Sequence, residues 1–208
     1  MPRSGAEARR RLQQAALELY RERGFDRTTT AEIAARAGVN ERTFFRHFPD
    51  KREVLFDGEA DLRAALTREV AAAPADLPPL AVLLRAFRKA ARILEDNRPF
   101  AEPRLALIAE TPALRERDLA KGAAVSEALA EALRGRGVPD RKADLAARTG
   151  WAAFHHAAQA WIDDSAPGDL AEGGSAAGGP AAGGSAQGLD RHLLRAFEDL
   201  RSLAAQAR

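Results

Sequence analysis

Cationic and hydrogen-bonding side chains gather in one short segment near the N-terminus. Glu41, Arg42, Thr43 and Arg46 fall on the outer side of a short predicted helix. An arginine in such a position can donate paired hydrogen bonds to phosphates or to base edges. Residues 1–52 hold 12 Lys and Arg against 7 Asp and Glu, although the whole chain has a net charge of only +2. This uneven charge favours a polyanionic partner for the first quarter, and a solvated face is the plainer alternative.

The sequence offers few residues of the types and spacings that catalysis or metal binding requires. The chain has no Cys, so a thiolate zinc site, a Cys nucleophile and a disulfide framework are excluded. His155 and His156 are adjacent and would point about 100° apart on a helix, which is a poor arrangement for sharing a metal. Asp163 and Asp164 are also adjacent and resemble solvent-exposed charge. The sequence therefore predicts no enzyme, no metal and no cofactor.

The elements that carry these residues are predicted to be helices. Ala, Leu, Glu and Arg dominate the composition, and alternating runs of β-branched residues are hard to find. No segment is apolar over the length needed to span a bilayer, and no apolar run of signal-peptide type begins the chain. We predict an all-α protein of the cytoplasm that does not enter a membrane.

The first domain, residues 1–52, is predicted to contain three helices. Apolar residues from Leu12 follow helical spacing up to Gly24, which suits the C′ position. Thr29 and Glu32 form a capping box that opens a second, short helix. Gly38 then provides a turn and Asn40 an N-cap for a third helix. Two short helices joined by a tight turn are the arrangement of a helix-turn-helix.

The second domain, residues 53–208, is predicted to be a helical bundle. A long helix is expected from Asp50 to Pro74, continuing past the boundary between the domains. Further helices are expected over residues 78–97, around Leu105 and Ile108, and over 112–135, 140–164 and 189–207. Residues 166–188 hold 8 of the 16 glycines and are predicted to be a flexible loop.

The N-terminal segment resembles the DNA-binding domain of the TetR (tetracycline-repressor-like) family of bacterial regulators. The matching residues are Gly24-Phe25, Thr28-Thr29-Thr30, Glu32-Ile33-Ala34, Ala37-Gly38-Val39, Thr43-Phe44-Phe45-Arg46-His47-Phe48, Lys51, Glu53 and Leu55. The match covers roughly residues 8–56. Beyond it, the chain agrees with the family only in length and helix content.

The resemblance implies contacts with double-stranded DNA for a defined set of residues. The recognition helix would present its first residues to base edges, with Asn40 either capping the helix or touching DNA. The family commonly has Tyr where this chain has Phe45, which cannot donate a hydroxyl to phosphate. His47 would contact the backbone or pack inside the domain. The implied DNA-binding residues are Thr29, Thr30, Asn40, Glu41, Arg42, Thr43, Phe45, Arg46, His47 and Lys51.

The family uses its second domain to dimerise and to bind an effector. The dimer would form through the helices around Trp151–Trp161 and Leu189–Ala207, and a homodimer would read a palindromic operator. A loose resemblance over Arg104–Arg117 favours a hydrophobic or acyl effector. Arg104 would pair with an anionic ligand group or lie on the surface. The candidate effector-binding residues are Phe87, Phe100, Arg104, Ile108, Trp151, Phe154 and His155.

Together these features predict a ligand-responsive DNA-binding transcriptional regulator, a repressor that is released from its operator by a small hydrophobic effector. The ligand would shift the long helix after Asp50 and so change the spacing of the two recognition helices, which must be about 34 Å. Two other classes remain: an enzyme in a helical bundle, and a protein-binding adaptor that has lost DNA binding. The basic spacing from Arg42 to Lys51 argues against the adaptor.

Overall fold

The computed structural model describes residues 3–164 and 188–206, and every regular element among them is helical. The predicted all-α class is confirmed. The predicted loop at 166–188 lies outside the described residues except for Gly188. The helices are α1 (Arg3–Arg23), α2 (Thr30–Arg36), α3 (Glu41–His47), η1 (Glu53–Phe56), α4 (Glu59–Ala71), α5 (Pro79–Asp96), α6 (Arg98–Glu110), α7 (Pro112–Gly135), α8 (Asp140–Asp163) and α9 (Leu189–Gln206).

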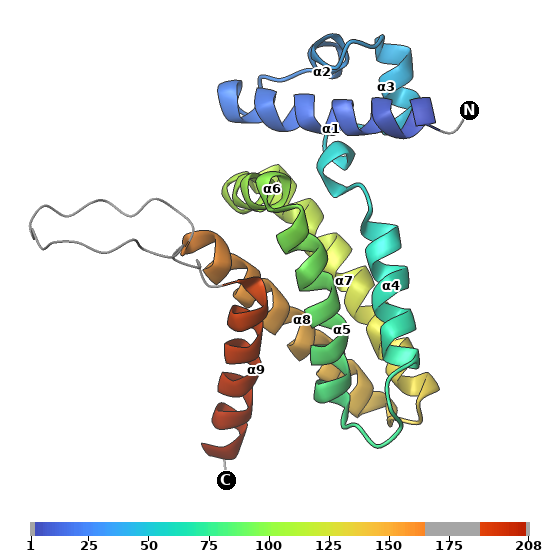
Figure 1. The fold of residues 1–208 in the computed structure, drawn as a ribbon, viewed down its shortest axis with the longest axis vertical. Coiled ribbons are helices and arrows are strands. Elements are labelled where there is room, and N and C mark those ends of the chain that lie inside the picture. Colours follow the sequence, from blue (N-terminus) through green and yellow to red (C-terminus); the bar gives the residue numbers. More distant parts are fainter. Residues whose placement is uncertain (1–2, 165–187, 207–208) are drawn as a thin grey trace, which may run out of the picture.

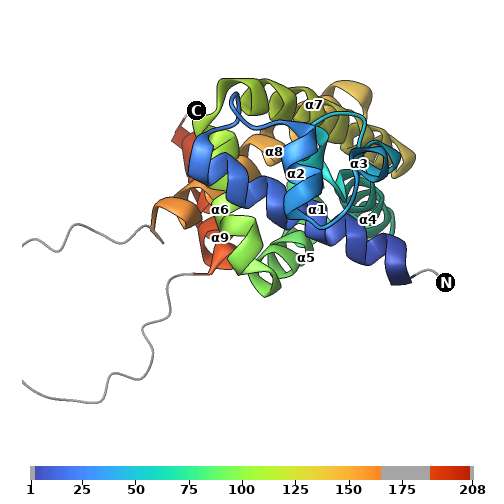
Figure 2. The same ribbon diagram turned by 90° about the horizontal axis from the view of Figure 1, so that it is seen from above.

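Helices α1 to α3 form a small unit that lies across one end of the longer helices (Figures 1 and 2). The predicted stop and turn glycines have positive φ angles, +84° at Gly24 and +69° at Gly38, which only glycine adopts readily. Thr29 and Glu32 form both halves of the predicted capping box. Asn40 caps α3 by accepting the Thr43 N–H at 2.8 Å. These local predictions are confirmed.

The core of this unit extends into the second domain. Ile33 and Phe44 are fully buried between α1, α2 and α3, as the wedge between the helices requires. The same cluster includes Ile108 of α6 and Leu114 of α7, together with Val54, Leu55 and Phe56 of η1. The DNA-binding unit therefore rests on α6 and α7, and η1 packs with it.

The predicted continuous helix from Asp50 to Pro74 is wrong. Asp50 does accept the N–H groups of Arg52 and Glu53, at 2.7 and 3.2 Å. The helix that follows is only the short 3₁₀ element η1, because three consecutive residues, 54–56, are all buried and cannot share one face of an α-helix. Gly58 then adopts φ +83° and separates η1 from α4.

At its far end α4 is held by Arg136, which follows α7. The Arg136 guanidinium donates to the carbonyl oxygens of Val70, Ala73 and Pro74 at 3.1, 2.6 and 2.6 Å. These carbonyls lie at or just beyond the end of α4, where helical partners run out. The turn between α4 and α5 is thus fixed to the end of α7.

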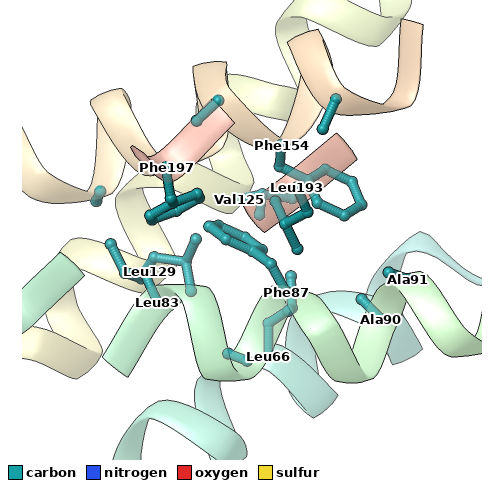
Figure 3. Packing of buried hydrophobic residues seen from close by; sticks show 14 of the residues in the cluster. Leu66, Leu83, Phe87, Ala90, Ala91, Val125, Leu129, Phe154, Leu193 and Phe197 are labelled. Carbon is teal, nitrogen blue, oxygen red and sulfur yellow. The ribbon is translucent and has the colours of Figure 1, made fainter. Parts of the chain in front are cut away.

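The main core of the second domain is centred on Phe87 of α5 (Figure 3). Its ring centroid lies 5.2 Å from that of Phe154 and 6.3 Å from that of Phe197, so α5, α8 and α9 meet there. Gly150 allows this approach, since a Cβ at that position would lie 3.0 Å from Leu83. Aromatic pairs at these separations stabilise the packing beyond the area they bury.

Helix α9 docks against α5 through polar contacts at its first turn. Arg88 donates two hydrogen bonds to the carboxylate of Asp190, at 2.7 and 2.9 Å, and Glu95 accepts the Asp190 N–H at 3.0 Å. The apolar face of α9 completes the core with Leu193 and Phe197. No helix within the described ranges is long and apolar enough to cross a membrane.

Candidate DNA-binding surface and ligand cavity

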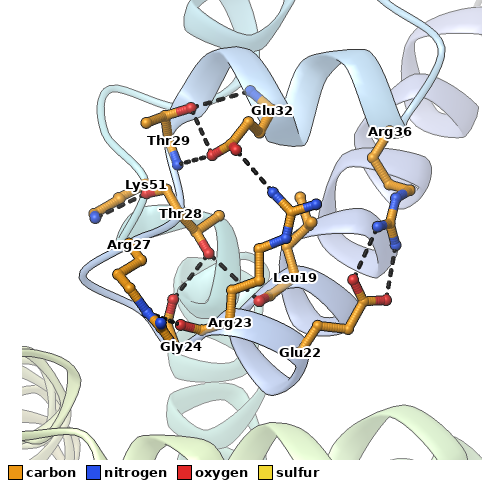
Figure 4. A network of polar contacts seen from close by, with 10 residues as sticks. All are labelled: Leu19, Glu22, Arg23, Gly24, Arg27, Thr28, Thr29, Glu32, Arg36 and Lys51. Carbon is orange, nitrogen blue, oxygen red and sulfur yellow. Dashed lines mark hydrogen bonds and ion pairs between the residues drawn. The ribbon is translucent and has the colours of Figure 1, made fainter.

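Polar contacts fix the loop that joins α1 to α2 (Figure 4). The Lys51 ammonium donates to the carbonyl oxygens of Phe25, Asp26 and Thr28 at 2.8, 3.3 and 2.9 Å, and lies 4.3 Å from the Phe25 ring centroid. The buried Thr28 hydroxyl donates to the Gly24 carbonyl at 2.9 Å. A lysine ammonium has three hydrogens. A phosphate contact for Lys51 therefore stays a prediction that requires the ammonium to leave these carbonyls.

The outer face of α3 carries two free cations. Arg42 and Arg46 are exposed and have no hydrogen-bond or ion-pair partner within residues 3–164 and 188–206. Phe45, on the same helix, is 53% exposed, which is unusual for an aromatic side chain. An unpaired, exposed arginine pair on a short helix can reach a polyanion without first breaking contacts inside the protein.

The remaining predicted polar residues are already engaged with one another. The Thr30 hydroxyl donates to the Glu41 carboxylate, which links α2 to the start of α3. The Thr29 hydroxyl caps α2, accepting the Glu32 N–H at 3.2 Å. Thr43 is half-buried and gives its N–H to Asn40. These side chains order the two helices, whatever else they contact.

His47 at the end of α3 sits in a cationic environment. Its Nε2 is enclosed and has no hydrogen-bond partner among the described residues. Burial lowers the pKa of the imidazole, and the charges of Arg46 and Arg9 lower that pKa further. The side chain is therefore held largely in its neutral form near neutral pH.

The seam between the two domains is lined by ion pairs on η1. Arg117 of α7 bonds to Glu53, and Lys121 lies 3.2 Å from the same carboxylate and also pairs with Glu59. From α6, Arg104 donates to the Leu55 carbonyl at 2.7 Å. Burial of Glu53 raises the pKa of its carboxyl. The hydrogen bonds and charges of Arg117 and Lys121 outweigh that effect, so the pKa is lowered. Helices α6 and α7 thus hold η1, the element that follows the DNA-binding unit.

A mostly apolar cavity of about 280 Å³ lies behind this seam. Helices α4 to α8 and the segment 56–59 contribute its walls. Trp151 and Phe154 stack with ring centroids 5.4 Å apart on the α8 side. His155 of α8 lies 3.7 Å from Asp118 of α7 at its polar edge. The cavity can take a small apolar molecule with one or two polar groups.

Four of the predicted effector-binding residues line this cavity and three do not. Arg104, Trp151, Phe154 and His155 contribute to its walls. Phe87 is fully buried behind Phe154, because α5 turns it into the core. Phe87, Phe100 and Ile108 do not line this cavity, and their part in effector binding stays a prediction. Ile108 belongs to the core beneath the DNA-binding unit, and Phe100 lines a separate cleft between α1 and α6.

Several cavity residues were absent from the sequence-based set. Lys121, Gly122 and Val125 come from one face of α7, and Leu62 comes from α4. The apolar spacing of both helices marks these faces as inward. Spacing alone does not separate residues that fill the core from residues that border a cavity.

A second hollow follows the outer side of α8 and α9. This groove, of about 570 Å³, is lined by small and apolar residues. Ala152, Ala153 and His156 line it from α8, and Ala196 and Leu203 from α9. Leu203 is 63% exposed. Small residues along two neighbouring helices allow a further helix to approach closely.

Comparison with known proteins agrees with this arrangement. Residues 12–57 match the family model described as bacterial regulatory proteins of the tetR family, and residues 77–174 match the model of the MftR C-terminal domain. The chain is 38% identical over 137 residues to the HTH-type transcriptional repressor Rv3405c of Mycobacterium tuberculosis, covering 62% of this chain and 72% of that protein. It is also 38% identical over 73 residues to the regulator TcmR of Streptomyces glaucescens, spanning 35% of this chain but only 32% of TcmR.

Solved structures share the fold. Thermus thermophilus FadR, a transcriptional repressor in complex with lauroyl-CoA, is 27% identical, with a TM-score of 0.52 and coverage of 92% of each chain. NalD of Pseudomonas aeruginosa is 20% identical, with a TM-score of 0.61 and coverage of 94% of this chain and 96% of NalD. At this identity, the NalD likeness concerns the fold alone.

Proposed function

Since this chain belongs to the TetR family of bacterial transcriptional regulators, we propose that it represses transcription as a homodimer on a palindromic operator. The observation that carries the proposal is the exposed pair Arg42 and Arg46 on α3, which have no partner in the described part of the chain. Repression is favoured by the names of its relatives, since Rv3405c and FadR are both called repressors. Thr43 and the start of α3 would face base edges, and Thr29, Thr30 and His47 would lie near the phosphates.

The proposed dimer forms through the groove on α8 and α9. A second copy would cover the exposed Leu203 and the alanines beside it. A two-fold axis through this face would relate the two α3 helices and account for a palindromic site.

A small apolar effector in the cavity behind η1 would lower the affinity for DNA. The support is the position of the cavity, whose walls include Phe56 and Gly58 at the junction of the two domains. A ligand that binds better when this junction is displaced shifts the population away from the DNA-binding arrangement. The likeness to FadR, which was solved in complex with lauroyl-CoA, supports an effector with an acyl chain.

The test is selection of bound duplexes from a random DNA pool by the purified protein, followed by a salt titration of the enriched sequence. The proposal predicts a palindromic site whose affinity falls steeply with salt, as expected when several phosphates are contacted. A non-palindromic site would contradict the dimer. An absence of enrichment at low salt would contradict DNA recognition itself.

A further inference from the structure

Arg104 differs from every other charged side chain that borders the cavity. Each acid there has a close partner: Asp57 pairs with Arg9 and Glu59 with Lys121, and Asp118 lies 3.7 Å from His155. Arg104 forms no ion pair within the described part of the chain, and it donates a hydrogen bond to the Leu55 carbonyl. It is therefore a cation at the edge of an apolar space, and no carboxylate of the described residues contacts it directly.

The physical chemistry of this position favours an anion. Burial lowers the pKa of Arg104, and the charge of Asp118 only partly opposes that effect. An arginine nonetheless stays protonated, so the charge remains and seeks compensation. The guanidinium has five N–H donors in a planar fork, and one of them is occupied by Leu55. A carboxylate in the cavity competes with the Leu55 carbonyl for this guanidinium, because its two oxygens can accept from two arms of the fork at once.

The surroundings of Arg104 define the rest of the ligand. Toward the cavity, Leu105, Trp151 and Phe154 provide apolar walls. On its other side, Arg104 also lines the cleft between α1 and α6, where Arg10 adds a second cation. A molecule that satisfies both sides has an apolar body and a single anionic group beside the guanidinium.

We infer that the cavity binds an amphipathic organic anion, and that this anion draws Arg104 away from the Leu55 carbonyl and so loosens η1 from α6. The inference rests on the proposed function, of which it specifies the ligand class and the point of regulation. Leu55 is 1% exposed, so its carbonyl has few other partners once Arg104 leaves. A charge-assisted hydrogen bond to a carboxylate is stronger than one to a carbonyl, which gives the exchange its direction.

Matched ligands test the charge requirement on the wild-type protein. Decanoate and 1-decanol carry the same apolar chain and differ in the charge of the head group, and isothermal titration calorimetry measures the affinity of each. We expect decanoate to bind about tenfold or more tightly, the effect of one charge-assisted hydrogen bond. Equal affinities, or binding of neither compound, overturn the inference.

Variants identify the cation. Arg104→Gln should bring the affinity for decanoate down to that for 1-decanol and leave the alcohol unaffected. Arg115→Gln is the matched control, because Arg115 is exposed on α7 and does not border the cavity. A preference for the acid that survives in Arg104→Gln assigns the anion to another group and overturns the inference.

Hydrogen exchange tests the link to η1. Decanoate should speed amide exchange within residues 53–56, and 1-decanol at equal occupancy should not. Binding of the acid with unchanged exchange there overturns the proposed release of η1. None of these measurements requires DNA, so they fail or succeed independently of the operator selection that tests the proposed function.

Discussion

The indole of Trp151 on α8 occupies the space that a side chain on Gly122 of α7 would fill. A Cβ at position 122 would lie 2.5 Å from the Trp151 Nε1 atom. Trp151 can therefore form this part of the cavity wall only because residue 122 of α7 has no side chain. No sequence pattern around Gly122 or Trp151 predicts that the two residues touch.

Gly122→Ala should force Trp151 from its position and lower the free energy of unfolding by about 1–3 kcal/mol, the usual cost of overpacking. Gly135→Ala is the control, since nothing lies within 4 Å of a Cβ at that end of the same helix. Chemical denaturation at one fixed protein concentration measures both variants. A Gly122→Ala protein as stable as the control would contradict the contact.

Arg42→Ala should weaken operator binding by about 1–3 kcal/mol and relax the preference at one position of the site. The physical reason is that Arg42 is free to read a base edge, with no internal partner among the described residues. Arg36→Ala is the matched control, because Arg36 is paired with Glu22 at 2.9 Å. Fluorescence anisotropy with operator and random duplexes separates the two. Equal losses on both duplexes would assign Arg42 to the phosphates.

Lys51→Met should destabilise the DNA-binding unit by about 1.5–3 kcal/mol, the range for hydrogen bonds to a charged group. The variant removes a donor from the carbonyls of Phe25 and Thr28. The neighbouring Arg52→Met should cost much less, because its pair with Asp50 is at the surface and is screened by solvent. If Lys51→Met is stable but shows a smaller salt dependence of DNA binding, the lysine contacts phosphate instead.

His47 should make stability fall at acidic pH. Its pKa is lowered in the folded protein from the ordinary value of 6.5, so the unfolded chain takes up the proton more readily. The loss therefore begins as pH drops below about 6.5 and is complete below the lowered pKa of the folded state. The free energy of unfolding, measured against pH for the wild type and His47→Gln, should differ in slope only in this window. Parallel curves would mean that His47 does not titrate differently on folding.

Ala152→Arg should yield a monomer. The residue is exposed on α8 in the groove proposed to receive the second copy, where a long cation would block the approach. Ala64→Arg places the same side chain on an exposed position of α4 and should leave the oligomeric state unchanged. Sedimentation velocity distinguishes the two. A dimeric Ala152→Arg protein would place the interface elsewhere.

Local signals made the first domain predictable. The caps at Thr29 and Asn40, and the glycines at positions 24 and 38, act through contacts within a few residues, and each formed as expected. The break at Gly58 was not predicted. The helical spacing around it continues on both sides, and the break arises from the burial of residues 54–56 between the domains, which is a tertiary effect.

The cavity was harder to predict because its walls come from distant parts of the chain. Arg104 and Trp151 could be proposed from their types and neighbours. Lys121 could not, since its role depends on Glu53 and Glu59, more than 60 residues away. Phe87 and Ile108 have the same apolar character as true wall residues. Which side of a helix faces a void is decided by packing, not by periodicity.

The three hydrogen bonds of Arg136 give α4 the mechanics of a lever. They pin its C-terminal end to α7, whereas the opposite end begins at Gly58, where the backbone can turn. With 13 residues, α4 is about 20 Å long. A tilt of about 5° around the pinned end would then move the Gly58 end by about 2 Å, given that length. The cavity borders α4 at this same end, through Gly58, Glu59 and Leu62, so a small change in the cavity acts directly where α4 joins the segment that leads to the DNA-binding unit.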